Sequence, residues 1–277
     1  MNAFAIHITA LTLSLLAATA AAQEPETPPR HTPGEIFRLT FPELPPTFFQ
    51  MYGHDDGPPG VLVRLPDDYD PKKPSPLCVY LDGGNGGYGS NIGVPNRIGG
   101  TDRCITANFP LWKRALPDPD VPWSIGVDFA DYFVISKAYA TILERLHAEL
   151  PNIDPETSII GGHSNGAKTL AVLLSLMDEN ILSTFQGFFF IDGGFEWASI
   201  GETEVLGKKD ILFLIGGGEE NPEWWREGQV SRIRYYDQVA RRLGMKRWRF
   251  VITPGVGHAF VPEYFEILRE WAREVGK

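Results

Sequence analysis

The stretch SIIGGHSNGAKTLAVLLSLM, residues 158–177, decides the fold prediction for this chain. It begins with a short apolar segment, passes through GHSNG at 162–166, and continues as an apolar segment of helical length. The pentapeptide fits the pattern G-x-S-x-G, which needs a strand before it and a helix after it because its serine sits on a sharp turn. The stretch therefore predicts a strand–turn–helix unit with Ser164 at the turn.

Each residue type in this turn has a physical reason. The turn brings backbone segments close together, so Gly162 and Gly166 leave no side chains in the way. Ser164 would stand at the start of a helix, whose N-terminus favours developing negative charge. A serine hydroxyl is a weak nucleophile until a base takes its proton, so the motif needs a histidine from elsewhere in the chain.

Of the six histidines, His258 stands where such a base is expected. It follows the apolar run 250–252 in a glycine-containing loop, and it comes after Ser164 in the chain. His163 adjoins the serine, but we expect it to face the wrong way along its strand. The other four lie in segments without this context: His7, His31, His54 and His147.

Apolar runs of strand length alternate with helical patterns on both sides of the turn. The runs cover 61–65, 77–81, 105–109, 187–191, 211–215 and 250–252, and the helical patterns cover 135–150, 229–243 and a segment from about 262. Continuous apolar strands are buried on both faces, which is typical of a parallel sheet, and the helices between them predict right-handed crossovers. We predict one α/β domain over residues 36–277 with a doubly wound, mostly parallel sheet of the α/β-hydrolase type.

Chemistry in such sheets collects at the carboxyl ends of the strands. An acid there would hold the tautomer of His258 and stabilise its imidazolium. Two strand ends qualify, because Asp192 follows the run 187–191, while Glu219 and Glu220 follow the run 211–215.

An oxyanion needs two hydrogen-bond donors. One donor should be the backbone N–H of Asn165, directly after the serine. The loop DGGNGG at 82–87 follows a strand, and its glycines allow a close backbone approach, so we place the second donor at Gly84, with Asn85 as its neighbour. No Gly-Lys-Ser/Thr follows this loop, which excludes a P-loop.

Two motifs resemble a known family. LPDDYD at 65–70 and GHSNGA at 162–167 are similar to secreted esterases of the α/β-hydrolase superfamily, of the polyhydroxybutyrate depolymerase and feruloyl esterase kind, and the resemblance extends from about residue 60 to the C-terminus. It implies hydrolysis of small-molecule or polymer carboxylic esters, without cofactor or metal. It also implies an acid after the later strand, which favours Glu220 over Asp192 and Glu219. Asp82 is a departure, since those families usually have His before the paired glycines.

Two other functions remain open: a serine peptidase of the prolyl-oligopeptidase kind, and a catalytically silent α/β-hydrolase used for binding. Loops at the carboxyl ends of strands carry specificity, so we expect Trp197 and Trp225 to line a substrate site, although core packing explains them as well.

Composition and the N-terminus limit the cellular setting. The net charge of −10 argues against a nucleic-acid partner, because phosphate binding needs a basic surface. Residues 1–22 fit a signal peptide with small residues at its end, and 23–35 form a Pro-rich tether. We therefore expect export to the periplasm or the exterior without a stable membrane anchor. An uncleaved anchor is the alternative.

Cys78 and Cys104 are the only cysteines. Both fall in or beside strand segments, and neighbouring strands rarely give disulfide geometry, so we expect two buried free thiols. Two cysteines cannot make a thiolate zinc site, and we expect no metal.

Overall fold

The computed structural model describes residues 31–44, 58–83, 92–111, 114–115, 125–126, 129–194, 203–218, 221 and 223–277. It leaves out the side chains of residues 114–115, 125–126, 203–204 and 224–226. One compact unit begins at His31 and runs to the C-terminus. The predicted signal peptide, residues 1–22, lies outside the described residues.

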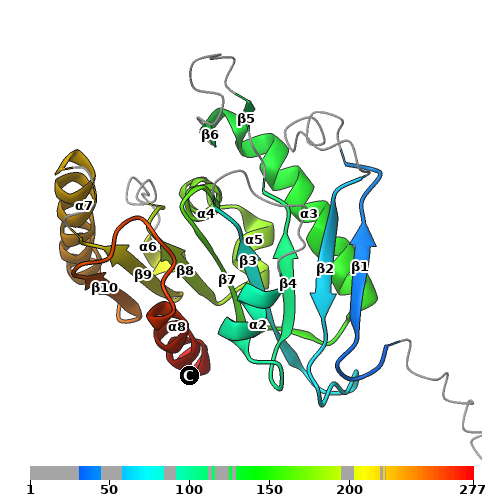
Figure 1. Ribbon diagram of the computed structural model, residues 1–277. Helices are drawn as coiled ribbons and strands as arrows, with labels where there is room; N and C mark the ends of the chain where they lie inside the picture. Colours follow the sequence, from blue (N-terminus) through cyan, green and yellow to red (C-terminus); the bar gives the residue numbers. More distant parts are fainter. Residues whose placement is uncertain are drawn as a thin grey trace, which may run out of the picture. The chain divides into compact units, whose positions relative to one another are not determined.

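An eight-stranded sheet organises this unit (Figure 1). Its spatial order is β1-β2-β4-β3-β7-β8-β9-β10. The strands from β4 to β10 in this order run parallel to one another, whereas β2 pairs antiparallel with both of its neighbours, β1 and β4. The predicted mostly parallel α/β sheet is confirmed. The strands are β1 (Ile36–Thr40), β2 (Gly60–Arg64), β3 (Ser75–Leu81), β4 (Ile105–Phe109), β7 (Ile153–His163), β8 (Gly187–Ile191), β9 (Asp210–Gly216) and β10 (Trp248–Thr253), with a separate pair, β5 (Arg114–Ala115) and β6 (Ile125–Gly126).

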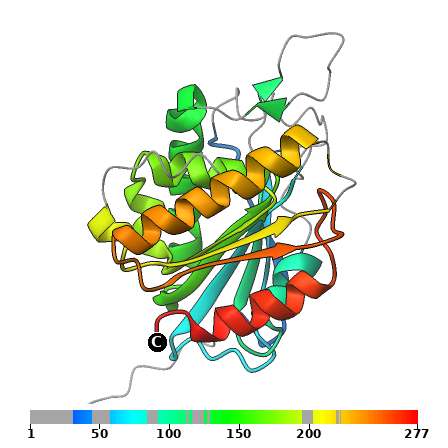
Figure 2. The ribbon, with the colours of Figure 1, turned by 90° about the vertical axis from the view of Figure 1, so that its left-hand side faces the viewer.

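Helices cover both faces of the sheet (Figure 2). One face carries α2 (Gly93–Gly99) and α8 (Glu263–Glu274). The other carries the 3-10 helix η1 (Phe129–Asp131), α3 (Tyr132–Glu149), α4 (Asn165–Ser175), α5 (Glu179–Thr184), α6 (Thr203–Leu206) and α7 (Glu223–Arg242). This arrangement is doubly wound, as predicted.

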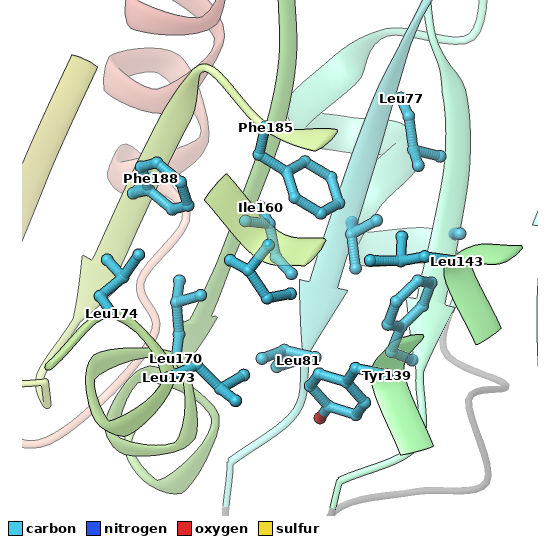
Figure 3. Close-up of a cluster of buried hydrophobic side chains, with 14 of the residues drawn as sticks. Leu77, Leu81, Tyr139, Leu143, Ile160, Leu170, Leu173, Leu174, Phe185 and Phe188 are labelled. Carbon is cyan, nitrogen blue, oxygen red and sulfur yellow. The ribbon is translucent and has the colours of Figure 1, made fainter. Parts of the chain in front are cut away.

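The two faces explain why the strands are apolar without interruption. In β8, Phe188 and Phe190 point into the cluster under α3 and α4, while Phe189 and Ile191 point into the cluster under α2 and α8. A strand with one polar face would bury polar groups, so the strand positions are apolar except where a polar side chain has a partner, as Asn108 in β4 does. Figure 3 shows part of the first cluster, where Phe188 from the sheet lies near the apolar side chains of α4.

Predicted and observed elements differ mainly at the ends. The runs 105–109 and 187–191 form strands with those bounds, whereas β7 begins at Ile153 and α7 begins six residues before the predicted helix. Strand β1 was not predicted, because its alternating exposed and buried residues lie at the sheet edge. Cys78 and Cys104 are buried and free, as expected.

The start of the unit differs from the predicted tether. His31 is buried, and its two ring nitrogens contact carboxylate oxygens of Glu35 and Glu149 at 3.3 and 2.8 Å. Gly34 donates its N–H to the carbonyl of Pro66. The last five residues of the segment 23–35 therefore pack on the domain, and the earlier ones lie outside the described residues. Among the helices that are described, none combines the length and the apolar character needed to cross a bilayer.

Candidate active site

The turn between β7 and α4 places Ser164. This residue has φ 54° and ψ −115°, a conformation that L side chains rarely adopt. The turn is as tight as the motif predicts, because a Cβ on Gly162 would lie 2.6 Å from the carbonyl carbon of Gly166, and one on Gly166 would lie 2.3 Å from the carbonyl oxygen of Leu81. Its strain holds the side chain of Ser164 at the carboxyl end of the sheet, at the first turn of a helix.

His258 reaches this serine from the loop after β10. Its Nε2 lies 3.0 Å from the hydroxyl oxygen of Ser164, a hydrogen-bond distance. The side chain of His258 is 36% exposed, so solvent and a substrate can reach the pair. The two residues that the sequence analysis paired, 94 positions apart in the chain, therefore meet at the carboxyl edge of the sheet.

Asp192 lies behind this histidine. It follows β8, has φ 46°, and is fully buried. Its Oδ2 is 3.9 Å from the Nδ1 of His258. Its carboxylate is fixed by two backbone N–H donors, Gly216 to Oδ1 at 2.6 Å and Ala259 to Oδ2 at 3.2 Å. Because the second donor follows His258 directly, the carboxylate and the imidazole are held in one local frame.

Burial shifts the pKa values of both groups. Burial raises the pKa of Asp192 to about 6, although the hydrogen bonds from Gly216 and Ala259 act in the opposite direction. Burial lowers the pKa of His258 below its usual value. Near pH 7 the site therefore combines a neutral imidazole, which can accept a proton, with an ionised carboxylate beside it.

His163 is the neighbour that the sequence analysis set aside. Its ring stacks on the ring of His258, with centroids 5.0 Å apart and planes 28° apart. Its Nε2 is buried without a hydrogen-bond partner in the described structure. Burial, and then the proximity of His258, lower the pKa of His163 to about 4. Its position beside His258 therefore disfavours protonation of His163. In the sequence, only the position of His163 at the end of a strand, directly before the turn, indicated that its ring could contact His258.

The loop after β3 passes beside the nucleophile. A Cβ on Gly83 would lie 2.7 Å from the Nδ1 of His163 and 3.2 Å from the Cβ of Ser164, so only glycine fits there. The carboxylate of Asp82 accepts a hydrogen bond from the buried amide of Asn108. The departure at residue 82 thus has a structural partner, on the strand next to β3.

The proposed oxyanion donors are only partly described. Asn165 is the first residue of α4, so its backbone N–H lies in the first turn of the helix, directly after the nucleophile. Gly84 and Asn85 lie outside the described residues, as do Glu219, Glu220 and Trp197. Trp225 lies in the first turn of α7, and its side chain is not described.

One atom from each of His163, Asp192 and His258 lies within 4.8 Å of the others, a spacing that would suit a metal ion. Nitrogen and oxygen ligands of this kind suit zinc. However, both oxygens of Asp192 already accept backbone hydrogen bonds, and the Nε2 of His258 contacts Ser164. The ligand atoms of Asp192 and the Nε2 of His258 are therefore already engaged by groups of the protein.

No protein-family model and no curated protein matches the chain. Several solved structures match the chain. A Bacillus cereus carboxylesterase matches with a TM-score of 0.52 and 16% identity, over 74% of this chain and 90% of that chain. Thermogutta terrifontis esterase 2 matches with a TM-score of 0.52 and 16% identity, over 90% and 96%. A putative dipeptidyl aminopeptidase IV from Bacteroides ovatus matches with a TM-score of 0.53 and 14% identity, over 87% of this chain and 36% of that one. At such identities the likeness shows the fold: the chain has the α/β-hydrolase fold.

Proposed function

We propose that the protein is a serine hydrolase that cleaves carboxylic esters through an acyl-enzyme on Ser164. The observation that carries the proposal is the 3.0 Å contact between the Ser164 hydroxyl and the Nε2 of His258, at the carboxyl ends of parallel strands. Nucleophile and base must be within hydrogen-bond reach for proton transfer, and this contact meets that requirement before any substrate binds.

Acylation follows from this geometry. With the proton of His258 on Nδ1, its Nε2 accepts the Ser164 proton as the serine oxygen attacks the ester carbonyl carbon. The tetrahedral oxyanion accepts hydrogen bonds from the backbone N–H of Asn165 and from the one proposed at Gly84. The protonated His258 then gives its proton to the leaving alkoxide, and the carbonyl remains bonded to Ser164.

Deacylation repeats these steps with water. His258 takes a proton from the water molecule that attacks the acyl carbon, and it returns this proton to the serine oxygen as the carboxylic acid leaves. Neither step needs an electron carrier or a second substrate besides water. The chain's own donors and acceptors therefore account for the full cycle.

We propose Asp192 as the acid of the triad, in preference to Glu220. The sequence alone favoured Glu220, which lies outside the described residues. Asp192 is buried 3.9 Å from the Nδ1 of His258, where an ionised carboxylate stabilises the imidazolium formed during each step. A small rotation of the histidine ring in the substrate complex would bring this contact to hydrogen-bond length, since catalytic hydrogen bonds are often long without substrate.

A fluorophosphonate probe and a substrate panel test the proposal together. The panel contains short and long p-nitrophenyl esters, feruloylated and acetylated sugars, a polyester, and dipeptide and proline amides. We expect stoichiometric labelling of the wild type and none of Ser164→Ala, with hydrolysis of esters and not of amides. Hydrolysis of the amides alone would favour the peptidase alternative. Absence of labelling in folded wild-type protein would leave the catalytically silent alternative.

The substrate class and the location are also proposals. The resemblance of the motifs supports secreted esterases acting on aryl, sugar or polymer esters, and Trp197 and Trp225 are the aromatic residues proposed to contact them. We further propose export, with cleavage after Ala22. N-terminal sequencing of the protein recovered from outside the cytoplasm tests this, and a start at Gln23 is expected.

A further inference from the structure

Four arginines line one cavity on the face of the sheet that carries α2 and α8. The cavity has a volume of about 340 Å³. Its walls come from the end of α2, the segment before β4, and the second half of α8 (Figure 2). The arginines are Arg97, Arg103, Arg269 and Arg273, and Asp102 is the only carboxylate among the lining residues.

Three of the four guanidinium groups have described contacts, and these contacts use few of their N–H groups. The guanidinium carbon of Arg97 lies over the ring of Phe265, 3.7 Å from the ring centroid, in a cation–π contact. Arg269 uses only its Nε, on the carbonyl of Arg97, and Arg103 uses one terminal nitrogen, on the carbonyl of Ala272. An arginine carries five N–H donors, so most of them remain.

The backbone between α2 and β4 is fixed as well. The carbonyl of Thr101 accepts hydrogen bonds from the N–H of Asp67 and from a terminal nitrogen of Arg64. The hydroxyl of Thr106 donates to the side-chain oxygen of Asn96, a residue of the cavity lining. The walls are therefore shaped without a ligand, and little conformational entropy is lost on binding.

The positive charge of the cavity exceeds the negative charge of its lining, which holds four arginines and one carboxylate, Asp102. Within the described ranges, none of the four arginines forms an ion pair, whereas Arg64, Arg241, Arg247 and Arg249 each pair with a carboxylate. The contrast is sharp in a chain whose net charge is −10. Four like charges around one cavity repel each other, and a bound anion removes that repulsion.

The cavity is far from the candidate active site in the topology. Residues 99–103 precede β4, so they lie at the amino-terminal edge of the parallel strands, whereas Ser164 follows β7 at the carboxyl edge. Helix α8 follows β10 and returns across the sheet, which brings its second half to the same amino-terminal edge (Figure 1). The arginines therefore serve a function other than ester hydrolysis.

We propose that this cavity binds a small tetrahedral oxyanion, a phosphate or sulfate group, free or as a monoester. Guanidinium groups match the oxygens of such groups bidentately, which favours them over chloride. The volume accommodates a single such group with its substituent. An extended polyanion is disfavoured, because the overall negative charge of the protein would repel it.

Calorimetric titration of the full chain with inorganic phosphate, and separately with glycerol phosphate, tests the proposal. We expect one site per chain for both probes. Arg269→Gln/Arg273→Gln should weaken the affinity by at least about tenfold, since it removes two charge-assisted contacts. Arg241→Gln/Arg249→Gln is the matched control, because it removes the same charge from arginines that already have carboxylate partners.

Binding should also raise Tm by about 5 to 10 °C at a probe concentration a hundredfold above Kd, relative to chloride at equal ionic strength. Binding of glycerol phosphate alone would limit the ligand to monoesters. Equal affinities in the wild type and the double variant, or no binding of either probe to the wild type at millimolar concentration, would overturn the proposal. Arg273→Gln alone makes the same test if the double variant does not fold, since the side chain of Arg273 forms no hydrogen bond or ion pair with described residues that its loss would break.

Discussion

The two edges of the sheet hold their charges in opposite ways. At the carboxyl edge, Asp192 is buried, has a left-handed backbone, and accepts hydrogen bonds from Gly216 and Ala259. At the amino-terminal edge, Arg269 and Arg273 are exposed on a regular helix and form no ion pair with described residues. Strain and burial at one edge fix a few groups for chemistry. Exposure at the other edge leaves several groups free to meet a diffusing ion.

The largest expected effect tests the chemistry of the carboxyl edge. Ser164→Ala should lower kcat for ester hydrolysis by about a million-fold, since it removes the nucleophile. The anion affinity measured at the other edge should not change. Steady-state kinetics and calorimetry on the same preparation check both. Turnover of the purified variant near the wild-type rate would remove Ser164 from the mechanism.

The next effect separates the two acid candidates. Asp192→Asn should lower kcat by about ten-thousand-fold, because the imidazolium loses its buried partner charge. Glu220→Gln should change kcat by at most about threefold, because Glu220 is not the proposed acid of the triad. The two variants are compared at pH 7 after circular dichroism shows a native fold. A collapse in Glu220→Gln with an active Asp192→Asn would return the acid to the strand end that the sequence favoured.

Proton binding at Asp192 should change activity and stability in opposite directions. Below about pH 6 the carboxyl is protonated, so kcat/KM should fall as pH decreases through this value. The folded-state pKa is raised above the unfolded value, so the protonated group stabilises the fold at low pH, and this stabilisation is lost as pH rises through about 6.

Urea unfolding of the wild type and of Asp192→Asn between pH 4 and pH 7 measures the second effect. The free energy of unfolding of the wild type, relative to the variant, should fall by about 2 kcal/mol over this range, since part of the full effect is lost below pH 4. A constant difference would mean that Asp192 titrates at its ordinary pKa. In that case the pH dependence of kcat/KM would have to come from His258.

The smallest expected effect concerns strain. Ser164→Gly should be more stable than Ser164→Ala by about 1 kcal/mol, because glycine adopts φ near 54° without the steric cost of a Cβ. Both variants lack the nucleophile, so the comparison isolates the backbone. Thermal unfolding measures it. Equal stabilities would show that the turn at residue 164 holds no strain.

The features that could be predicted from the sequence are those that depend only on neighbouring residues in the chain. Strands β4 and β8 were predicted with their observed bounds, because a strand buried on both faces needs only its own apolar residues to be recognised. Strand β1 was not predicted, because its alternating sequence is a weak strand signal. Its place in the sheet depends on its pairing with β2. The motif around Ser164 and the position of His258 were also readable, since each depends on its neighbours in sequence.

The rest of the site depends on contacts between distant segments. Asp192 and Glu220 both follow strands, and only the packing of β8 against β9 places Asp192 behind His258. His163 was set aside because strand alternation says nothing about a ring that meets it from the loop after β10. The cavity brings together arginines up to 176 positions apart, so no local pattern indicates it.

Two backbone hydrogen bonds, at the nucleophile and at the proposed acid, affect how the site responds to heat. The N–H of Ser164 donates to the carbonyl of Ile191 at 2.8 Å, and the N–H of Asp192 donates to the carbonyl of Leu214 at 2.9 Å. The nucleophile and the proposed acid are thus tied into the pairing of β7, β8 and β9, which are interior strands of the sheet. Such segments open only with the whole domain, whereas loops open locally and at lower cost. The active geometry should therefore persist on warming until the cooperative melting of the core, so that the loss of activity and the loss of fold coincide.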